Sequence, residues 1–168
     1  MEGRELMNQD SCRKIINTLV GMLRQSLGDN LTSVALFGSR TRGTARADSD
    51  IDLLLVVRHA PPVYHERLKP VFEAVRQLRK LLSGQGETSL PEVNFLVLSE
   101  EEAREGRGIY LDMVEEAVLL ADDRGFLQTR LDEVRDRMAE LGCRRVAVGA
   151  DWYWELKPNL KPGETVSL

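Results

Sequence analysis

Cysteine and histidine are scarce in this sequence, with only two of each among 168 residues. Cys12 and Cys143 lie far apart and fit no CxxC or Cys/His spacing, which argues against a zinc site or a disulfide framework. Such a chain is expected in a reducing cytoplasm. His59 and His65 have no third ligand at a metal-binding spacing. We therefore interpret both as loop histidines.

Long apolar runs are also missing. No stretch approaches the ~18 apolar residues that a membrane-spanning helix needs, and the opening MEGRELMNQDS lacks the apolar core of a signal peptide. We expect a soluble cytoplasmic protein that enters no membrane. The net charge of −4 argues against non-specific binding to nucleic acid, because such binding depends on neutralising phosphates. The length fits one domain, which at this size buries roughly 70% of its unfolded surface.

The spacing of apolar residues predicts an α+β protein in which a small mixed sheet is flanked by helices. The unbroken apolar run 53–57 predicts a central strand that is buried on both faces. Pro70 is expected to kink one helix or to delay its start, and Ser99 with Glu102 forms a capping box for the next. The predicted strands are 32–37, 51–57, 93–98 and 118–120, and the predicted helices are 11–27, 64–82, one that starts at 99, 109–117 and 126–141.

The end of the chain is expected to form an appendage to the sheet domain. We divide the chain into a domain over 1–121 and a C-terminal helix with an aromatic tail over 122–168. This tail packs on the domain or joins subunits of a homo-oligomer. Trp152 and Trp154 would share a face of an extended segment, and large aromatic side chains usually bury themselves or mark an interface; stacking on a nucleotide base is the alternative. The inner face of the helix 64–82 is predicted to carry Leu68, Val71, Phe72, Val75, Leu78 and Leu82.

The polar segment between the first two predicted strands begins with Gly38-Ser39. A glycine after a buried strand lets the backbone approach a ligand, and a following helical turn directs free N–H groups toward the same point, which suits an anion. Arg40, Arg42 and Arg46 add positive charge nearby. Taken alone, a Gly-Ser turn is more often a plain connection between two elements.

Asp50 and Asp52 stand where the second predicted strand begins, and residues two apart share one face of a strand. Two carboxylates this close repel each other unless a cation lies between them. Mg²⁺ or Mn²⁺ suits such oxygen ligands, and Mg²⁺ commonly combines one or two carboxylates with substrate phosphates. Taken alone, the pair is explained as well by a solvated turn and a cap. Ten residues separate Gly38-Ser39 from this pair of carboxylates. Together the turn and the pair predict a triphosphate anchor that faces a metal site, as metal-assisted nucleotidyl transfer requires.

The stretch GSRTRGTARADSDIDLLLVV resembles the signature of the minimal nucleotidyltransferases of the DNA polymerase beta superfamily, and the resemblance covers about residues 31–98. It implies a palm-like mixed sheet, binding of a nucleoside triphosphate, and Mg²⁺ on the catalytic residues Asp50 and Asp52. In some relatives the enzyme is encoded beside a HEPN protein, which it adenylylates as part of a toxin–antitoxin pair. The residues that match the signature are Gly38, Ser39, Arg40, Gly43, Ser49, Asp50 and Asp52, and those assigned to the nucleotide are Gly38, Ser39, Arg40 and Ser49.

The resemblance also implies a third carboxylate on the neighbouring strand, which would help to hold a metal and act as a base. Asn94 takes the matching position here, and an amide cannot serve as a base. Glu92, one step earlier on the same face, could substitute as the third catalytic residue. Two hypotheses therefore stay open: an active nucleotidyltransferase, or an antitoxin or interaction module that binds nucleotide or a partner protein and transfers poorly.

The acceptor of the reaction stays open as well. It could be a protein tyrosine, a small alcohol or aminoglycoside, or a nucleic-acid end, of which the acidic net charge disfavours the last. ATP is only the default choice of nucleotide, because no segment can be assigned to the edge of the base.

Overall fold

A four-stranded sheet forms the centre of the computed structural model, which describes residues 9–43, 46, 49–84, 90–149, 151–161 and 163–168. Its strand order is β3-β2-β1-β4. β2 is antiparallel to β1 and parallel to β3, and β4 is antiparallel to β1. The predicted mixed α+β sheet is therefore confirmed. The strands are β1 (Leu31–Phe37), β2 (Ile51–Val57), β3 (Val93–Ser99) and β4 (Val118–Asp122).

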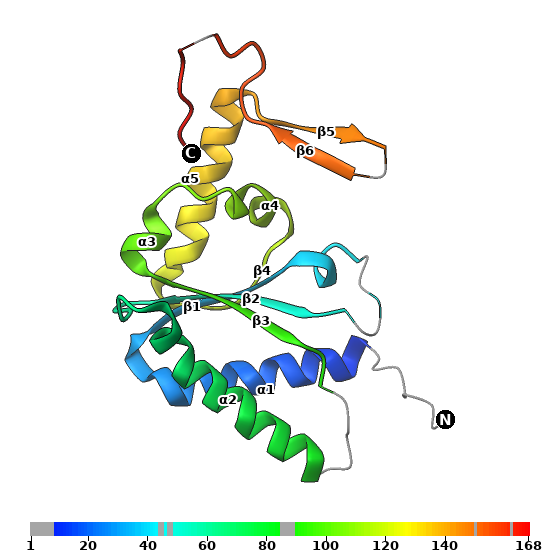
Figure 1. Ribbon diagram of the computed structural model, residues 1–168, viewed down its shortest axis with the longest axis vertical. Coiled ribbons are helices and arrows are strands. Elements are labelled where there is room, and N and C mark those ends of the chain that lie inside the picture. The colour runs from blue at the N-terminus through cyan, green and yellow to red at the C-terminus, as the bar shows by residue number, and fades with distance from the viewer. Residues whose placement is uncertain (1–8, 44–45, 47–48, 85–89, 150, 162) are drawn as a thin grey trace.

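Helices cover both faces of this sheet (Figure 1). Two long helices lie on one face, and three helices that follow β3 or β4 in the chain lie on the other. Short 3-10 turns, η1 (Gly28–Asn30), η2 (Gly38–Arg40) and η3 (Asp123–Gly125), connect elements at the ends of the strands. The helices are α1 (Gln9–Leu27), α2 (Tyr64–Gly84), α3 (Glu100–Arg104), α4 (Ile109–Glu116) and α5 (Phe126–Leu141).

Strand β2 separates two apolar cores because its side chains alternate between the faces of the sheet. Ile51, Leu53 and Leu55 belong to the core formed with α1 and α2. Leu54 and Val56 belong to the core formed with α4 and α5. All five side chains are fully buried. The prediction of a central strand buried on both faces is confirmed, and this strand fixes the position of the carboxylates at its start.

Helix α2 corrects two predictions. It begins at Tyr64 and continues through Pro70, so His65 lies in its first turn and not in a loop. Phe72, predicted to face inward, is 58% exposed. The buried stripe consists of Val71, Ala74, Val75, Leu78 and Leu82, which follow steps of three or four residues. Phe72 lies one residue from Val71 and is therefore rotated about a quarter-turn away from that stripe.

The other local predictions agree closely with the structure. β2 and α5 have the predicted bounds, and Gly142 ends α5 in the left-handed conformation at φ 70°. The capping box is present, since Ser99 Oγ accepts from the Glu102 N–H and the Glu102 carboxylate accepts from the Ser99 N–H. His59 lies in a loop, as predicted, where its backbone bonds to the Asn30 side chain. The sequence also suggests a loop over 84–89, of which residues 85–89 lie outside the described residues.

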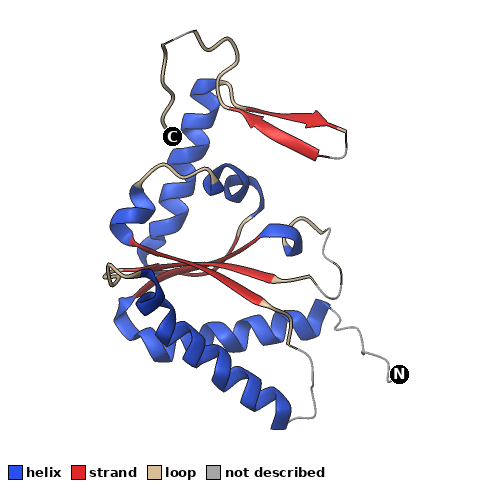
Figure 2. Ribbon diagram, viewed as in Figure 1, coloured by secondary structure: helices blue, strands red, loops and turns tan. Residues whose placement is uncertain are grey.

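The C-terminal segment forms a hairpin that the sequence did not predict. β5 (Arg144–Val148) pairs antiparallel with β6 (Asp151–Glu155) in a separate two-stranded sheet, which extends to the side from the C-terminal end of α5 (Figure 2). Trp152 and Trp154 share a face, as expected, with their rings at a T-shaped 84°. α5 buries Leu127 and Val134 in the second core, so this helix completes the packing of the sheet. No helix in the described part of the chain is long and apolar enough to span a membrane.

Candidate active site

The turn after β1 lies against the first residues of β2. Phe37, the last residue of β1, pairs with Asp52 in the sheet. Gly38 follows at φ +83°, and a Cβ built on it would lie 2.4 Å from Asp52 Oδ2. Glycine is favoured here, because the left-handed conformation strains other residues and a side chain would displace the Asp52 carboxylate. The predicted anion turn and one predicted metal ligand are therefore neighbours.

Asn94 completes this arrangement from β3. In the parallel pairing of β2 with β3, Asn94 is the partner of Asp52. Its side-chain amide donates to Asp52 Oδ1 at 3.0 Å and, more weakly, to Asp50 Oδ2 at 3.4 Å. The structure thus brings Asp50, Asp52 and Asn94 together at one end of the sheet. The amide lies between two carboxylates that would otherwise repel each other across a short gap.

Glu92 occupies a less central position. Its backbone carbonyl accepts a hydrogen bond from the Ile51 N–H at 2.8 Å, just before β3 begins, and its side chain is exposed. Among the described residues, no group of three or more His, Cys, Asp or Glu side chains could hold a metal ion. The structure therefore does not gather Glu92 with Asp50 and Asp52 into a three-carboxylate site. Its suggested catalytic role remains a prediction.

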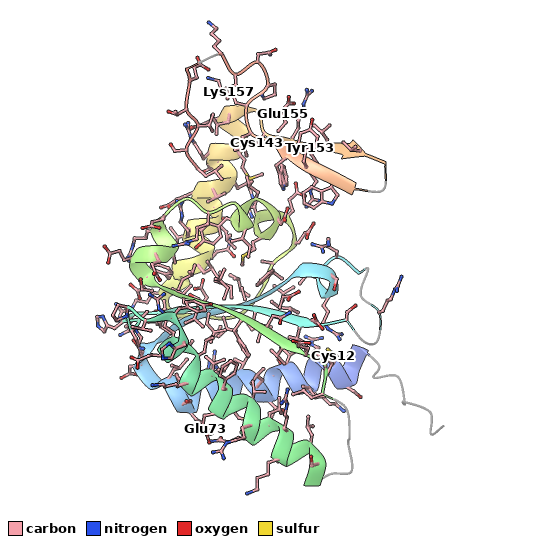
Figure 3. The ribbon with its side chains drawn as sticks, viewed as in Figure 1. Cys12, Glu73, Cys143, Tyr153, Glu155 and Lys157 are labelled. Atoms are coloured by element: carbon pink, nitrogen blue, oxygen red, sulfur yellow. The ribbon has the colours of Figure 1, made fainter. Side chains whose placement is uncertain are left out.

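Arg40 holds the loop that carries the carboxylates. Its Nε donates to the Asp50 carbonyl at 3.0 Å, and its Nη2 donates to the Ser49 carbonyl. Cys12 of α1 is buried at the same end of the sheet, where burial raises the pKa of its thiol and the charge of Arg40 opposes that rise (Figure 3). Two of the Arg40 donors therefore bind backbone carbonyls. The sequence motif alone did not indicate these contacts.

Ser49 also makes contacts within this loop. Its hydroxyl accepts from the Arg46 N–H at 2.8 Å, and its own N–H donates to the Arg46 carbonyl at 3.1 Å. Ser39 lies in the 3-10 turn η2, directly after Gly38. The Thr41 hydroxyl donates to the Gly38 carbonyl at 2.8 Å and reinforces the turn. The binding of nucleotide by these serines remains a prediction.

The donor set fits a magnesium ion better than a softer metal. Asp50 and Asp52 offer carboxylate oxygens, and the missing side chain of Gly38 lets the backbone of the turn lie against the Asp52 carboxylate. Mg²⁺ commonly uses one or two carboxylates and completes its shell with substrate phosphates and water. Two carboxylates beside an anion-binding turn therefore suit a metal that arrives with a nucleotide.

One part of the site could not be foreseen from the motif. The carboxylate of Glu116, at the end of α4, accepts hydrogen bonds from Arg42 Nη1 at 3.0 Å and from Arg145 Nη2 at 2.5 Å. Its side chain is only 11% exposed. Arg145 belongs to the hairpin and stacks on the rings of Trp152 and Trp154, at 4.3 and 5.1 Å from their centroids. Glu116 therefore connects the turn after β1 with the hairpin.

The hairpin has a second attachment to the same helix. Trp154 Nε1 donates to Asp112 Oδ1 at 2.7 Å. Burial lowers the pKa of Arg145, but the hydrogen bond to Glu116 and the charges of Glu115, Glu116 and Asp112 outweigh this effect and raise it. No sequence pattern indicates these contacts, because Arg42 and Glu116 are separated by 74 residues.

Comparisons with known proteins identify the family of this chain. The family model "Nucleotidyltransferase domain" matches residues 16–123. A stretch of 69 residues is 35% identical to MJ1305 of Methanocaldococcus jannaschii, whose name proposes a protein adenylyltransferase. That match covers 41% of this chain and 47% of the relative, so the chain spans about half the length of the curated relative it matches.

Two solved structures have a similar arrangement at low identity. A chain from a toxin–antitoxin complex with AMP-PNP is 18% identical, with a TM-score of 0.46, over 75% of this chain and 92% of that one. A chain from the complex of tri-AMPylated Shewanella oneidensis HEPN toxin with MNT antitoxin is 16% identical, with a TM-score of 0.44, over 77% and 92%. Because the family model matches more than half of the sequence, this chain belongs to the nucleotidyltransferase domain family.

Proposed function

We propose that this protein transfers a nucleoside monophosphate from an NTP, with ATP as the default, to a hydroxyl group of an acceptor. One observation carries the proposal: the Gly38 backbone lies directly against the Asp52 carboxylate, with a built Cβ only 2.4 Å from Oδ2. A triphosphate on the Gly38-Ser39 turn would therefore meet a metal held by Asp50 and Asp52. Membership of the family supports the same reaction.

In this reaction the acceptor oxygen attacks the α-phosphorus, a new P–O bond forms, and the bond to the β-phosphate oxygen breaks so that pyrophosphate leaves. Mg²⁺ or Mn²⁺ on Asp50 and Asp52 would neutralise phosphate oxygens and lower the pKa of the attacking hydroxyl. Gly38 and Ser39 bind the triphosphate, while Arg40 keeps Ser49 and Asp50 in place through their carbonyls. Asn94 orients the carboxylates. Since its amide is no base, the acceptor proton passes to a carboxylate or to water.

For the acceptor we favour a partner protein. The 35%-identical stretch in a relative named as a protein adenylyltransferase supports this choice. The resemblance to minimal nucleotidyltransferases further suggests a HEPN-type partner, with both proteins in the cytoplasm. A homo-oligomer formed through the hairpin is compatible with this assignment, since Tyr153 and Val148 are exposed there.

A second candidate function rests on Asn94. Its amide occupies the position where a third carboxylate would assist catalysis, and it donates to Asp52. A protein with this site could bind NTP and a partner yet transfer slowly, and so act as an interaction module. Such a protein would show saturable binding of Mg²⁺·NTP but little transfer of nucleotide to its partner.

The deciding experiment measures the transfer of label from an α-labelled NTP to the protein encoded by the neighbouring gene, with and without Mg²⁺. We expect Mg²⁺-dependent labelling that Asp52→Asn abolishes. The matched control is Asp29→Asn, an exposed aspartate in η1 at the other end of β1. Labelling that survives Asp52→Asn would refute the proposal. Saturable Mg²⁺·NTP binding without labelling would favour the second candidate.

A further inference from the structure

Two arginines line a pocket between α3 and the first half of α5. The cavity has a volume of about 370 Å³, and its lining residues are Arg104, Phe126, Thr129, Arg130 and Glu133. Arg104 belongs to α3, and the other four belong to α5. The guanidinium carbon of Arg104 lies 4.8 Å from the centroid of the Phe126 ring, so these two side chains stack across the gap between the helices. The pocket therefore combines two cations with a hydroxyl, a carboxylate and an aromatic ring.

This pocket lies at the end of the sheet opposite the catalytic carboxylates. Ser33, near the start of β1, pairs with Asp122 at the end of β4, directly before η3 and α5. Phe37, at the other end of β1, pairs with Asp52. α3 starts directly after β3, and β3 runs parallel to β2, so α3 also lies at the end far from Asp52. Figure 1 shows α3 and the start of α5 at one end of the sheet and the turn after β1 at the other.

Arg130 carries a buried donor that no protein acceptor satisfies. Across the described residues, its Nε is the one buried side-chain nitrogen or oxygen without a hydrogen-bond partner. The side chain is only 13% exposed, and its Nη1 donates to the Glu133 carboxylate at 3.1 Å. Buried polar groups of native proteins are nearly always satisfied by protein, water or ligand, because an unpaired donor on a charged group is costly. Arg130 can therefore take a further acceptor oxygen.

The other groups around the pocket suit an oxyanion. Guanidinium groups bind carboxylate and phosphate oxygens through two parallel hydrogen bonds. Arg104 Nη2 donates to Glu100 at 3.3 Å, which is longer than the ~2.7–2.9 Å of a strong charged pair. The Nε of Arg130 is covered, so an anion must displace a neighbouring side chain to reach it. Arg104 and Glu133 are 60% and 59% exposed, and such exposed ion pairs contribute little, so both side chains can move at low cost.

The positive end of α5 is not the source of this attraction. The Leu127 and Gln128 N–H groups donate to the Asp122 carboxylate, which also accepts from Ser33 Oγ. The first turn of the helix is therefore already capped by a negative charge. The attraction for an anion comes from the side chains of the two arginines.

We propose that this pocket binds a small organic molecule through a phosphate or carboxylate group, with Arg104 and Arg130 as the residues that hold the anion. The volume falls within the ~300–1,000 Å³ of small-molecule sites, so the ligand is larger than a bare ion. Phe126 offers it an apolar surface, and Glu133 offers an acceptor to a hydroxyl group. The proposal goes beyond the transfer reaction, since the pocket lies at the other end of the sheet.

The competing explanation is that Arg130 only covers the core. Its guanidinium carbon lies 5.9 Å from the ring centroid of Tyr110, which is fully buried. A cation above an aromatic ring is stabilised without any ligand. The two explanations differ in whether an added anion binds at this place, and in the effect of changing Arg104, which lies over Phe126 instead.

The test titrates the full chain with sodium phosphate and, separately, with sodium succinate, in EDTA and at constant ionic strength. Amide chemical shifts locate the bound anion, and calorimetry measures its affinity. The pocket variants are Arg104→Ala and Arg130→Lys. Their matched controls are Arg76→Ala in α2 and Arg135→Lys in α5, which change exposed arginines that pair with an acid three residues earlier. Gly38→Ala separates the pocket from the triphosphate turn.

We expect saturable shifts of the Arg104, Thr129 and Arg130 amides with at least one probe. Arg104→Ala should weaken binding by about tenfold, the usual loss for hydrogen bonds to a charged group. Arg130→Lys should weaken it by about threefold or more, because lysine keeps the charge but lacks the paired donors. The two controls and Gly38→Ala should keep wild-type affinity. The probe that binds more tightly distinguishes a phosphate ester from a carboxylic acid as the ligand class.

An absence of saturable binding with both probes would overturn the proposal. Shifts confined to Gly38 and Ser39 would overturn it as well, because the anion would then occupy the triphosphate turn. Equal losses in Arg76→Ala would indicate general attraction to arginines and have the same consequence. Thermal unfolding checks each variant, and if Arg130→Lys unfolds, Arg104→Ala and the wild-type shifts decide. None of these outcomes affects the proposed transfer reaction, which is judged by labelling.

Discussion

The side-chain amide of Asn94 donates to Asp52 Oδ1 across 3.0 Å, and the two residues are direct partners in the parallel pairing of β2 with β3. The amide therefore offsets part of the repulsion between Asp52 and Asp50 without a cation. This hydrogen bond explains how the sheet tolerates two carboxylates at one edge. It also makes Asn94 the most informative residue to change.

Asn94→Asp should make stability depend on divalent cations. Three carboxylates would then meet at one point, so the melting temperature in EDTA should fall below that of wild type and recover with Mg²⁺. If a base limits the reaction, the transfer rate should rise by about tenfold or more. Asn30→Asp is the control, because Asn30 bonds to the His59 backbone far from the site. A melting temperature of Asn94→Asp that ignores Mg²⁺ would contradict this account.

Gly38→Ala should abolish transfer, whereas Gly28→Ala should not. Both glycines have positive φ, +83° and +53°, so both substitutions carry a backbone cost of about 1 kcal/mol. Only at Gly38 would the new methyl group meet Asp52 Oδ2, at 2.4 Å, while nothing lies within 4 Å at Gly28. The measurements are the transfer rate and the free energy of unfolding. Similar activity in the two variants would show that the close approach of turn and carboxylate is not needed.

The ion pair between α2 and α3 should give stability a defined pH dependence. Arg67 donates to both Glu102 oxygens, at 2.6 and 3.0 Å, and this pair, followed by the hydrogen bond with Ser99, lowers the Glu102 pKa below its ordinary 4.5. A lowered pKa in the folded state means that the stabilisation is complete at neutral pH. It is lost as the pH falls below 4.5 and passes through the pKa of the folded protein.

Glu102→Gln should therefore cost about 1–3 kcal/mol at pH 7 and flatten the decline of stability between neutral and acidic pH. Denaturant unfolding measured across that range is the test. Glu140→Gln serves as the control, since the Arg137–Glu140 pair is largely exposed and should change stability by less than about 0.5 kcal/mol. An equally steep acid decline in Glu102→Gln would assign the decline to other groups.

Local signals in the sequence predicted the strands of the sheet and most of its helices well. β2 and α5 were found with their bounds because an apolar run, helical periodicity and a terminating glycine are local features, and the start of α3 was found because its capping box is local too. Phe72 was misplaced because several apolar residues on one helix compete for a single stripe, and spacing alone did not settle which ones face inward. The prediction of a mixed sheet followed from the succession of predicted helices and strands and from the resemblance to the family, whereas the strand order came only from the structure.

Long-range contacts were beyond the reach of the sequence. Arg40 was expected beside an anion, but its donors meet the carbonyls of Ser49 and Asp50, and a motif does not show backbone acceptors. Glu116 carries no motif, and its partners come from distant parts of the chain. The hairpin was missed because β5 is short and begins with two arginines, so its pairing with β6 depends on partners that local patterning does not show.

Because side chains alternate along β2, the two faces of the sheet differ in what they carry. Asp50 and Asp52 fall in register with Leu54 and Val56, which pack toward α4 and α5, whereas α1 and α2 pack on the opposite face. Under the proposed function, an acceptor would therefore reach the carboxylates from the face of the sheet that α4 and α5 cover. We therefore expect substitutions in the α1–α2 layer to change stability, and substitutions on α4 and α5 to change access to the carboxylates. The choice of acceptor and the stability of the fold would then depend on opposite faces of the same sheet.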